Sequence, residues 1–103
     1  MMVVWLEQAD MALSHTVDYI ASEYGEMAKE KFMCKVDEVG VLLADNPYLG
    51  PVEPLLSDLP SGYRSVVVAK LNKIVYRINN NRIEIADFWD CRREPDTLAG
   101  QLK

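Results

Sequence analysis

Basic side chains concentrate in one part of this sequence, between positions 64 and 93. This stretch holds seven Lys or Arg against three Asp or Glu, whereas residues 1–63 hold three against eleven. Such a region attracts a polyanion or an acidic peptide locally, even though the whole chain carries a net charge of −5. The alternative is that the basic residues only keep an open sheet face soluble and protect its edges. The basic positions are Arg64, Lys70, Lys73, Arg77, Arg82, Arg92 and Arg93.

The basic stretch ends in a Trp-Asp-Cys-Arg-Arg run at residues 89–93. Asp90 can orient Arg92 or Arg93 through a charge-assisted hydrogen bond. An Asp–Arg pair that only closes the edge of a sheet is the alternative. We therefore assign Trp89 and Asp90 structural or orienting roles rather than catalytic ones.

Metal-binding and redox chemistry have little support in the residue types present. The two cysteines, Cys34 and Cys91, make neither a disulfide framework nor a metal site, which usually needs more ligands. His15 is the single histidine and is expected to face solvent on a helix. We predict no metal, no cofactor and reduced cysteines, with a Cys34–Cys91 disulfide as the alternative.

The basic stretch itself predicts a three-strand antiparallel meander over residues 63–93. Its apolar runs are rich in Val, Ile, Tyr, Phe and Trp, which suit a half-buried pleated surface. Leu71-Asn72 and Asn79–Asn81 are candidate hairpin turns. Alternation places Ile74, Tyr76, Ile83 and Ile85 on one apolar face, which must be covered, and spaced Arg and Lys on the other.

The first half of the chain can supply that cover. Residues 3–6 predict a strand of the same sheet, and apolar spacings of three and four predict helices over about 8–24 and 27–44. With Gly25 between them, the helices should form an antiparallel hairpin. Their inner faces should carry Ala9, Leu13, Val17, Ile20 and Tyr24, then Ala28, Phe32, Val36, Val39 and Leu43. Met11, Met27 and Met33 are expected to fill gaps in the core.

Residues 47–62 contain four of the five prolines and predict a long loop without regular structure. Loops of this length are often functional. Leu55, Leu56 and Leu59 are expected to hold it against the core. The 103 residues then form a single α+β domain, residues 1–103. No apolar run approaches a bilayer span or a signal peptide, so a cytoplasmic protein without a membrane partner is expected.

The order strand, helix hairpin, Pro/Gly loop and three-strand meander resembles that of the RelE/ParE toxin superfamily over nearly the whole chain. The third strand is similar in particular to the ParE-like, plasmid-stabilisation branch, in which an Asp-x-Arg-x-x-Pro sequence typically ends that strand. The matching residues are Val3-Val4-Trp5, Ala9, Leu13, Tyr19-Ile20, Leu43, Asn46-Pro47, Gly50, Gly62-Tyr63-Arg64-Ser65, Lys73-Ile74-Val75-Tyr76, Phe88-Trp89-Asp90-Cys91-Arg92 and Pro95.

This resemblance implies a type II toxin that a cognate antitoxin neutralises, by a segment that folds on binding. It also implies one of two mechanisms. RelE-like members cut mRNA on the ribosome, and ParE-like members bind and block DNA gyrase without catalysis. A homodimer is compatible with either, and a decayed toxin kept as a binding partner is a third interpretation.

The residues favour the ParE-like mechanism. Arg64, Lys73 and Arg92 match positions where ribonuclease members often hold basic residues, which could stabilise a phosphorane. The proton-transfer group is missing, because no Tyr or His follows Tyr76. Strong RNA binding also usually accompanies a basic chain, and this one is acidic. We therefore predict a non-enzymatic gyrase inhibitor, with a ribosome-dependent mRNA endonuclease as the alternative.

Overall fold

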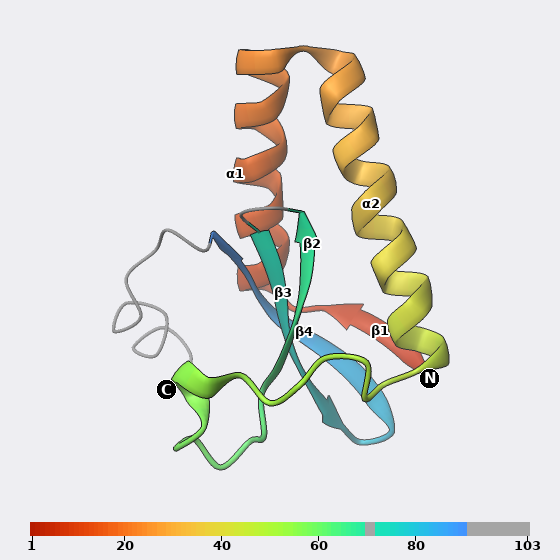
Figure 1. Cartoon of the computed structure of the whole chain (residues 1–103), viewed down its shortest axis with the longest axis vertical. Coiled ribbons are helices and arrows are strands. Elements are labelled where there is room, and N and C mark those ends of the chain that lie inside the picture. The colour runs from red at the N-terminus through yellow and green to blue at the C-terminus, as the bar shows by residue number, and fades with distance from the viewer. Residues whose placement is uncertain (70–71, 91–103) are drawn as a thin grey trace.

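A computed structural model describes residues 1–69 and 72–90, and its elements follow the predicted order (Figure 1). Strand β1 is followed by the helices α1 and α2, a loop with a short 3₁₀ helix η1, and the three strands β2, β3 and β4. Their bounds are β1 Met2–Trp5, α1 Glu7–Tyr24, α2 Glu26–Asp45, η1 Pro54–Leu56, β2 Arg64–Ala69, β3 Asn72–Asn79 and β4 Arg82–Asp90. No helix in the described part of the chain is both long and apolar enough to cross a membrane.

The four strands form one mixed sheet in the order β1-β4-β3-β2. β1 lies parallel to β4, and the other neighbours are antiparallel. The hairpin turn predicted at the three asparagines is confirmed, since Asn80 and Asn81 have φ of 54° and 59° and supply the left-handed conformations that a tight turn needs. Asn72, predicted as a turn residue, is instead the first residue of β3 and pairs with Ala69. The α+β fold class is confirmed.

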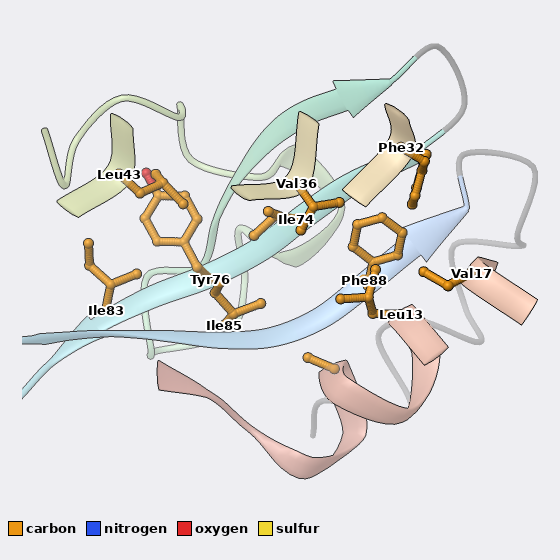
Figure 2. Close-up of a cluster of buried hydrophobic side chains, with 11 residues drawn as sticks. Leu13, Val17, Phe32, Val36, Leu43, Ile74, Tyr76, Ile83, Ile85 and Phe88 are labelled. Atoms are coloured by element: carbon orange, nitrogen blue, oxygen red, sulfur yellow. The ribbon is translucent and has the colours of Figure 1, made fainter. Parts of the chain in front are cut away.

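The helix pair covers one face of the sheet, as the apolar alternation predicted. Figure 2 shows Phe32 and Val36 of α2 above Ile74 and Phe88 of the sheet. The rings of Phe32 and Phe88 meet edge to face with centroids 5.9 Å apart, a preferred aromatic geometry. The buried members of this main core are Ala9, Leu13, Val17, Phe32, Val36, Leu43, Ile74, Tyr76, Ile83, Ile85 and Phe88.

Three predicted core residues of the helices are exposed instead. Tyr24 and Met27 are 70% and 75% exposed, because the hairpin extends past the end of the sheet and its tip has no strand to pack against (Figure 1). Met11 is also exposed. Met33 is partly buried against the core, as predicted.

An extra residue in β4 determines which side chains reach each face of the sheet. The register shifts so that Tyr76 pairs with Ile85 while Val75 pairs with Asp87. This bulge at residues 86–87 lets Ile85 and Phe88 join the main core, while Ala86 belongs to a second cluster.

The second cluster overturns the prediction of an uncovered face. Leu56 of η1 packs with Tyr63, Val75, Ala86 and Trp89, and all five are buried. The Pro-rich loop therefore lies over the face that the helices leave free. Leu59 is partly buried there, as predicted, but Leu55 is 40% exposed, so the expectation that it anchors the loop was wrong.

Candidate functional site

A buried carboxylate joins the loop to the far face of the sheet, the face away from the helices. Glu53 immediately precedes η1 and is only 1% exposed. Its Oε2 accepts hydrogen bonds from the Lys73 ammonium, at 2.8 Å, and from the Ser65 hydroxyl. Its Oε1 accepts a longer bond from the Leu55 backbone N–H at 3.5 Å. One carboxylate thus connects the loop to β2 and β3.

The environment of Glu53 keeps it ionised. Burial alone would raise the pKa of its carboxyl group, because desolvation disfavours the charged form. The hydrogen bonds from Lys73 and Ser65, and the charge of Lys73, outweigh that effect, and the pKa is lowered overall. The carboxylate is therefore a weak Brønsted base, and it has almost no access to solvent.

Lys73 is held on its other side by Trp89. The ammonium nitrogen lies 4.4 Å from the centroid of the Trp89 ring, within the range of a cation–π contact. Trp89 is 3% exposed, and its indole Nε1 has no hydrogen-bond partner among residues 1–69 and 72–90. The structural role predicted for Trp89 fits its place in the second cluster.

A second buried carboxylate, Glu84, neutralises two more of the predicted basic positions. Arg82 donates to its Oε2 at 2.6 and 2.9 Å, and Arg77 donates to its Oε1 at 3.0 Å. Asn79 contributes a longer bond at 3.4 Å. The hydrogen bond from Arg82 is the main cause of a lowered Glu84 pKa, which burial opposes. Arg77 and Arg82 are thus both paired with a carboxylate of the same chain.

Arg64 lies on the other face of the sheet from Lys73. It pairs across the strands with Tyr76, a member of the main core, whereas Lys73 pairs with Val67. The Arg64 guanidinium donates to the backbone oxygen of Gly50 at 2.8 Å and lies 4.9 Å from the ring centroid of the exposed Tyr48. Arg64 therefore fastens the start of the loop.

Tyr76 fastens the same stretch from inside the core. Its hydroxyl donates to the Pro47 backbone oxygen at 2.8 Å and accepts from the Gly50 N–H at 3.0 Å. Burial raises the pKa of this phenol. The hydrogen bond from Gly50 and the charge of Arg64 offset part of that increase. Gly50 has no room for a side chain, because a Cβ there would lie 2.2 Å from the backbone oxygen of Ser65.

The seven predicted cations do not form one face. Lys73, Arg77 and Arg82 lie on the far face, and Arg64 lies on the helix side. Lys70, Arg92 and Arg93 lie outside the described residues, and so do the arginines that Asp90 was predicted to orient. The functional roles of all seven stay predictions. His15 is exposed on α1, and Cys34 is a free, exposed thiol, while Cys91 lies outside the described residues.

Sequence reasoning missed both carboxylates. Glu84 could have been found, because it alternates onto the same strand face as Arg82 and lies between two core isoleucines. Glu53 could not have been found in this way. It lies in a loop, where no repeating pattern of apolar residues shows that it contacts the sheet. No group of three or more potential metal ligands occurs within residues 1–69 and 72–90.

Known proteins match this chain in structure but not in sequence. No protein-family model matches it, and no curated protein does. A chain of the "Chromosomal ParDE TA system from P. aeruginosa" matches with a TM-score of 0.71 and 19% identity, over 87% of this chain and 95% of that one. The "YoeB/ParE toxin from Agrobacterium tumefaciens" matches with a TM-score of 0.59 and 18% identity, over 87% and 98%. The chain therefore shares the fold of these two structures, as the sequence resemblance predicted.

Proposed function

We propose that this chain is the toxin of a type II toxin–antitoxin module, of the ParE-like kind, and that a cognate antitoxin neutralises it. The fold supports the proposal, because the matching structures are a ParDE toxin–antitoxin system and a YoeB/ParE toxin. Within this proposal the toxin blocks DNA gyrase by binding it and catalyses no reaction of its own.

The placement of Arg64 and Lys73 supports a mechanism without catalysis. RNA cleavage without a metal needs cations that converge on one phosphorane. Arg64 and Lys73 occupy opposite faces of the β2–β3 pair, and each already holds a partner within the fold, Gly50 for Arg64 and Glu53 for Lys73. These two cations do not converge on one site.

Three proton-transfer groups in the described part of the chain, Glu53, Tyr76 and His15, are poorly placed for the same reaction. A general base must come within hydrogen-bond reach of the proton that it removes. Glu53 is buried beneath the loop, and the hydroxyl of Tyr76 is bonded to the backbone of Pro47 and Gly50. His15 lies exposed on α1. This supports recognition of a protein surface as the source of toxicity.

Growth arrest and two purified-component assays test the proposal. Induced expression should arrest growth, and purified protein should inhibit supercoiling by gyrase while leaving mRNA on programmed ribosomes intact. Cuts in ribosome-bound mRNA with unaffected gyrase would establish the RelE-like mechanism instead.

A paired substitution tests the predicted role of the arginines. Arg64→Ala combined with Arg92→Ala should abolish growth arrest, with Lys31→Ala on the exposed side of α2 as the matched control. Circular dichroism must show a folded double variant, because Arg64 also bonds to Gly50. Full toxicity in that folded variant would remove the arginines from the mechanism.

A further inference from the structure

Residues 51–62, which we call the cover segment, are anchored on the sheet by two fully buried side chains, with Leu59 partly buried beside them. Glu53 and Leu56 are each 1% exposed, whereas Val52 and Leu55 beside them are 48% and 40% exposed. Glu53 meets Lys73 and Ser65, and Leu56 enters the cluster of Tyr63, Val75, Ala86 and Trp89. The anchors are three residues apart, so the 3₁₀ turn places them on the same side.

We propose that the surface beneath these anchors is a peptide-binding site and that the cover segment is its tethered occupant. The external ligand is a segment of a partner protein that carries a carboxylate and, three residues later on a helical turn, a leucine. This inference rests on the proposed function only in taking the ligand from a partner protein. It does not depend on whether the target is gyrase.

The chemistry of the site matches such a ligand. Lys73 and the Ser65 hydroxyl supply donors for a carboxylate, and the second cluster supplies an apolar pocket for the leucine. Trp89 adds an observation that points beyond the cover segment. Its buried Nε1 has no acceptor among the described residues, so a ligand that supplied one would make a hydrogen bond that the cover segment does not make.

A ligand that replaced the cover segment would substitute its own carboxylate for that of Glu53. An incoming carboxylate leaves Lys73 paired, which avoids the cost of a buried charge without a partner. Within the described part of the chain, few other hydrogen bonds hold the segment in place. Backbone bonds join Glu53 to Tyr63 at 2.9 Å and Ser65 to Pro51 at 3.1 Å, and an exposed side-chain bond joins Arg77 to Ser61 at 3.2 Å.

A labelled peptide with the sequence of residues 51–58, Pro-Val-Glu-Pro-Leu-Leu-Ser-Asp, is a direct probe of this site. In the unaltered protein the tethered segment competes at an effective concentration on the order of mM, so the peptide should bind weakly. The variant Leu56→Ala weakens that competitor and should bind the peptide at least tenfold more tightly. Leu55→Ala, which alters an exposed neighbour, should behave like the unaltered protein.

Two changes test whether the carboxylate is recognised. A peptide with Gln in place of its Glu should bind the Leu56→Ala variant at least tenfold more weakly, and adding Lys73→Met to that variant should have a similar effect. If Leu56→Ala does not fold, Glu53→Gln weakens the other anchor with almost no change in volume. Circular dichroism identifies the folded variants.

Several results would overturn the inference. One is that a folded anchor variant binds the peptide no more tightly than the unaltered protein does. Another is that the peptide with Gln in place of Glu binds as tightly as the original peptide. A concentration-dependent dimer without peptide binding would assign the site to exchange of the cover segment between two copies. All these readouts are independent of growth arrest and of gyrase, so failure here is distinct from failure of the proposed function.

Discussion

The pair between Glu53 and Lys73 makes an asymmetric prediction about stability. The Glu53 side chain is 2% exposed, whereas that of Lys73 is 19% exposed. Lys73→Met leaves a buried carboxylate with only Ser65 and Leu55 as donors, and loss of one partner of a buried pair costs about 3–5 kcal/mol. Because Lys73 leaves some access for water, we expect the lower end of that range, about 3 kcal/mol.

The reverse change should cost less. Glu53→Gln leaves Lys73 with its cation–π contact to Trp89 and partial access to water, so we expect a loss of about 1–2 kcal/mol. The double variant leaves no uncompensated charge and should lose less stability than the two single changes combined. The difference should be about 1–2 kcal/mol, within the range measured for directly bonded pairs.

The stability that Glu53 contributes should decrease as the pH falls. The pKa of Glu53 is lowered in the folded state, so its contribution to stability is present above the unfolded value of about 4.3 and is lost as the pH falls through the folded value. Lys73→Met removes the hydrogen bond and the charge that lower this pKa. The carboxyl group of the variant then takes up a proton more readily, and the cost of the substitution should shrink between pH 7 and pH 4.

Urea unfolding monitored by far-ultraviolet circular dichroism measures these free energies of unfolding at both pH values. Fluorescence is unsuitable, since removal of Lys73 changes the surroundings of Trp89 directly. Lys35→Met on the exposed side of α2 is the matched control and should change the free energy by less than about 0.5 kcal/mol. A cost for Lys73→Met no greater than that of Glu53→Gln, or one that is the same at pH 4, would refute the reasoning.

Three further predictions concern the loop and the β3–β4 turn. Tyr76→Phe should cost about 1–3 kcal/mol, because two backbone groups lose their partner, while Tyr19→Phe on an exposed helix site should be nearly neutral. Since burial raises the pKa of Tyr76, the unaltered protein should also lose stability above about pH 10, and the Phe variant should lose less there. Gly50→Ala should cost about 3 kcal/mol or more in thermal or urea unfolding, since its Cβ would meet the backbone. Asn81→Val should cost about 1–2 kcal/mol in the same assay because of the left-handed backbone, and Asn81→Gly should stay within about 0.5 kcal/mol.

The fold could be predicted from the sequence because periodicity reports on the main core. Spacings of three and four gave both helices, and alternation gave the face of β3 and β4 that the helices cover. Periodicity does not report how far a helix extends past its neighbours. Tyr24 continues the apolar stripe of α1 but lies beyond the end of the sheet and is exposed. Met27 is exposed as well.

The candidate site was much harder to predict, since it depends on contacts between a loop and a sheet. The Pro-rich composition correctly predicted a loop, but no local signal shows that Glu53 reaches Lys73 across 20 positions. The basic stretch was therefore interpreted as an open cationic face, whereas buried carboxylates pair with Lys73, Arg77 and Arg82. Charge counted along a sequence does not show which charges pair in space.

The measurement that tests the proposed function most directly is a titration of the purified protein into a gyrase supercoiling reaction, with the same preparation added to programmed ribosomes. We predict that supercoiling stops as the protein approaches the concentration of gyrase, and that the ribosome-bound mRNA stays intact. Active gyrase at a large excess of folded protein, together with mRNA cut on the ribosome, would contradict it.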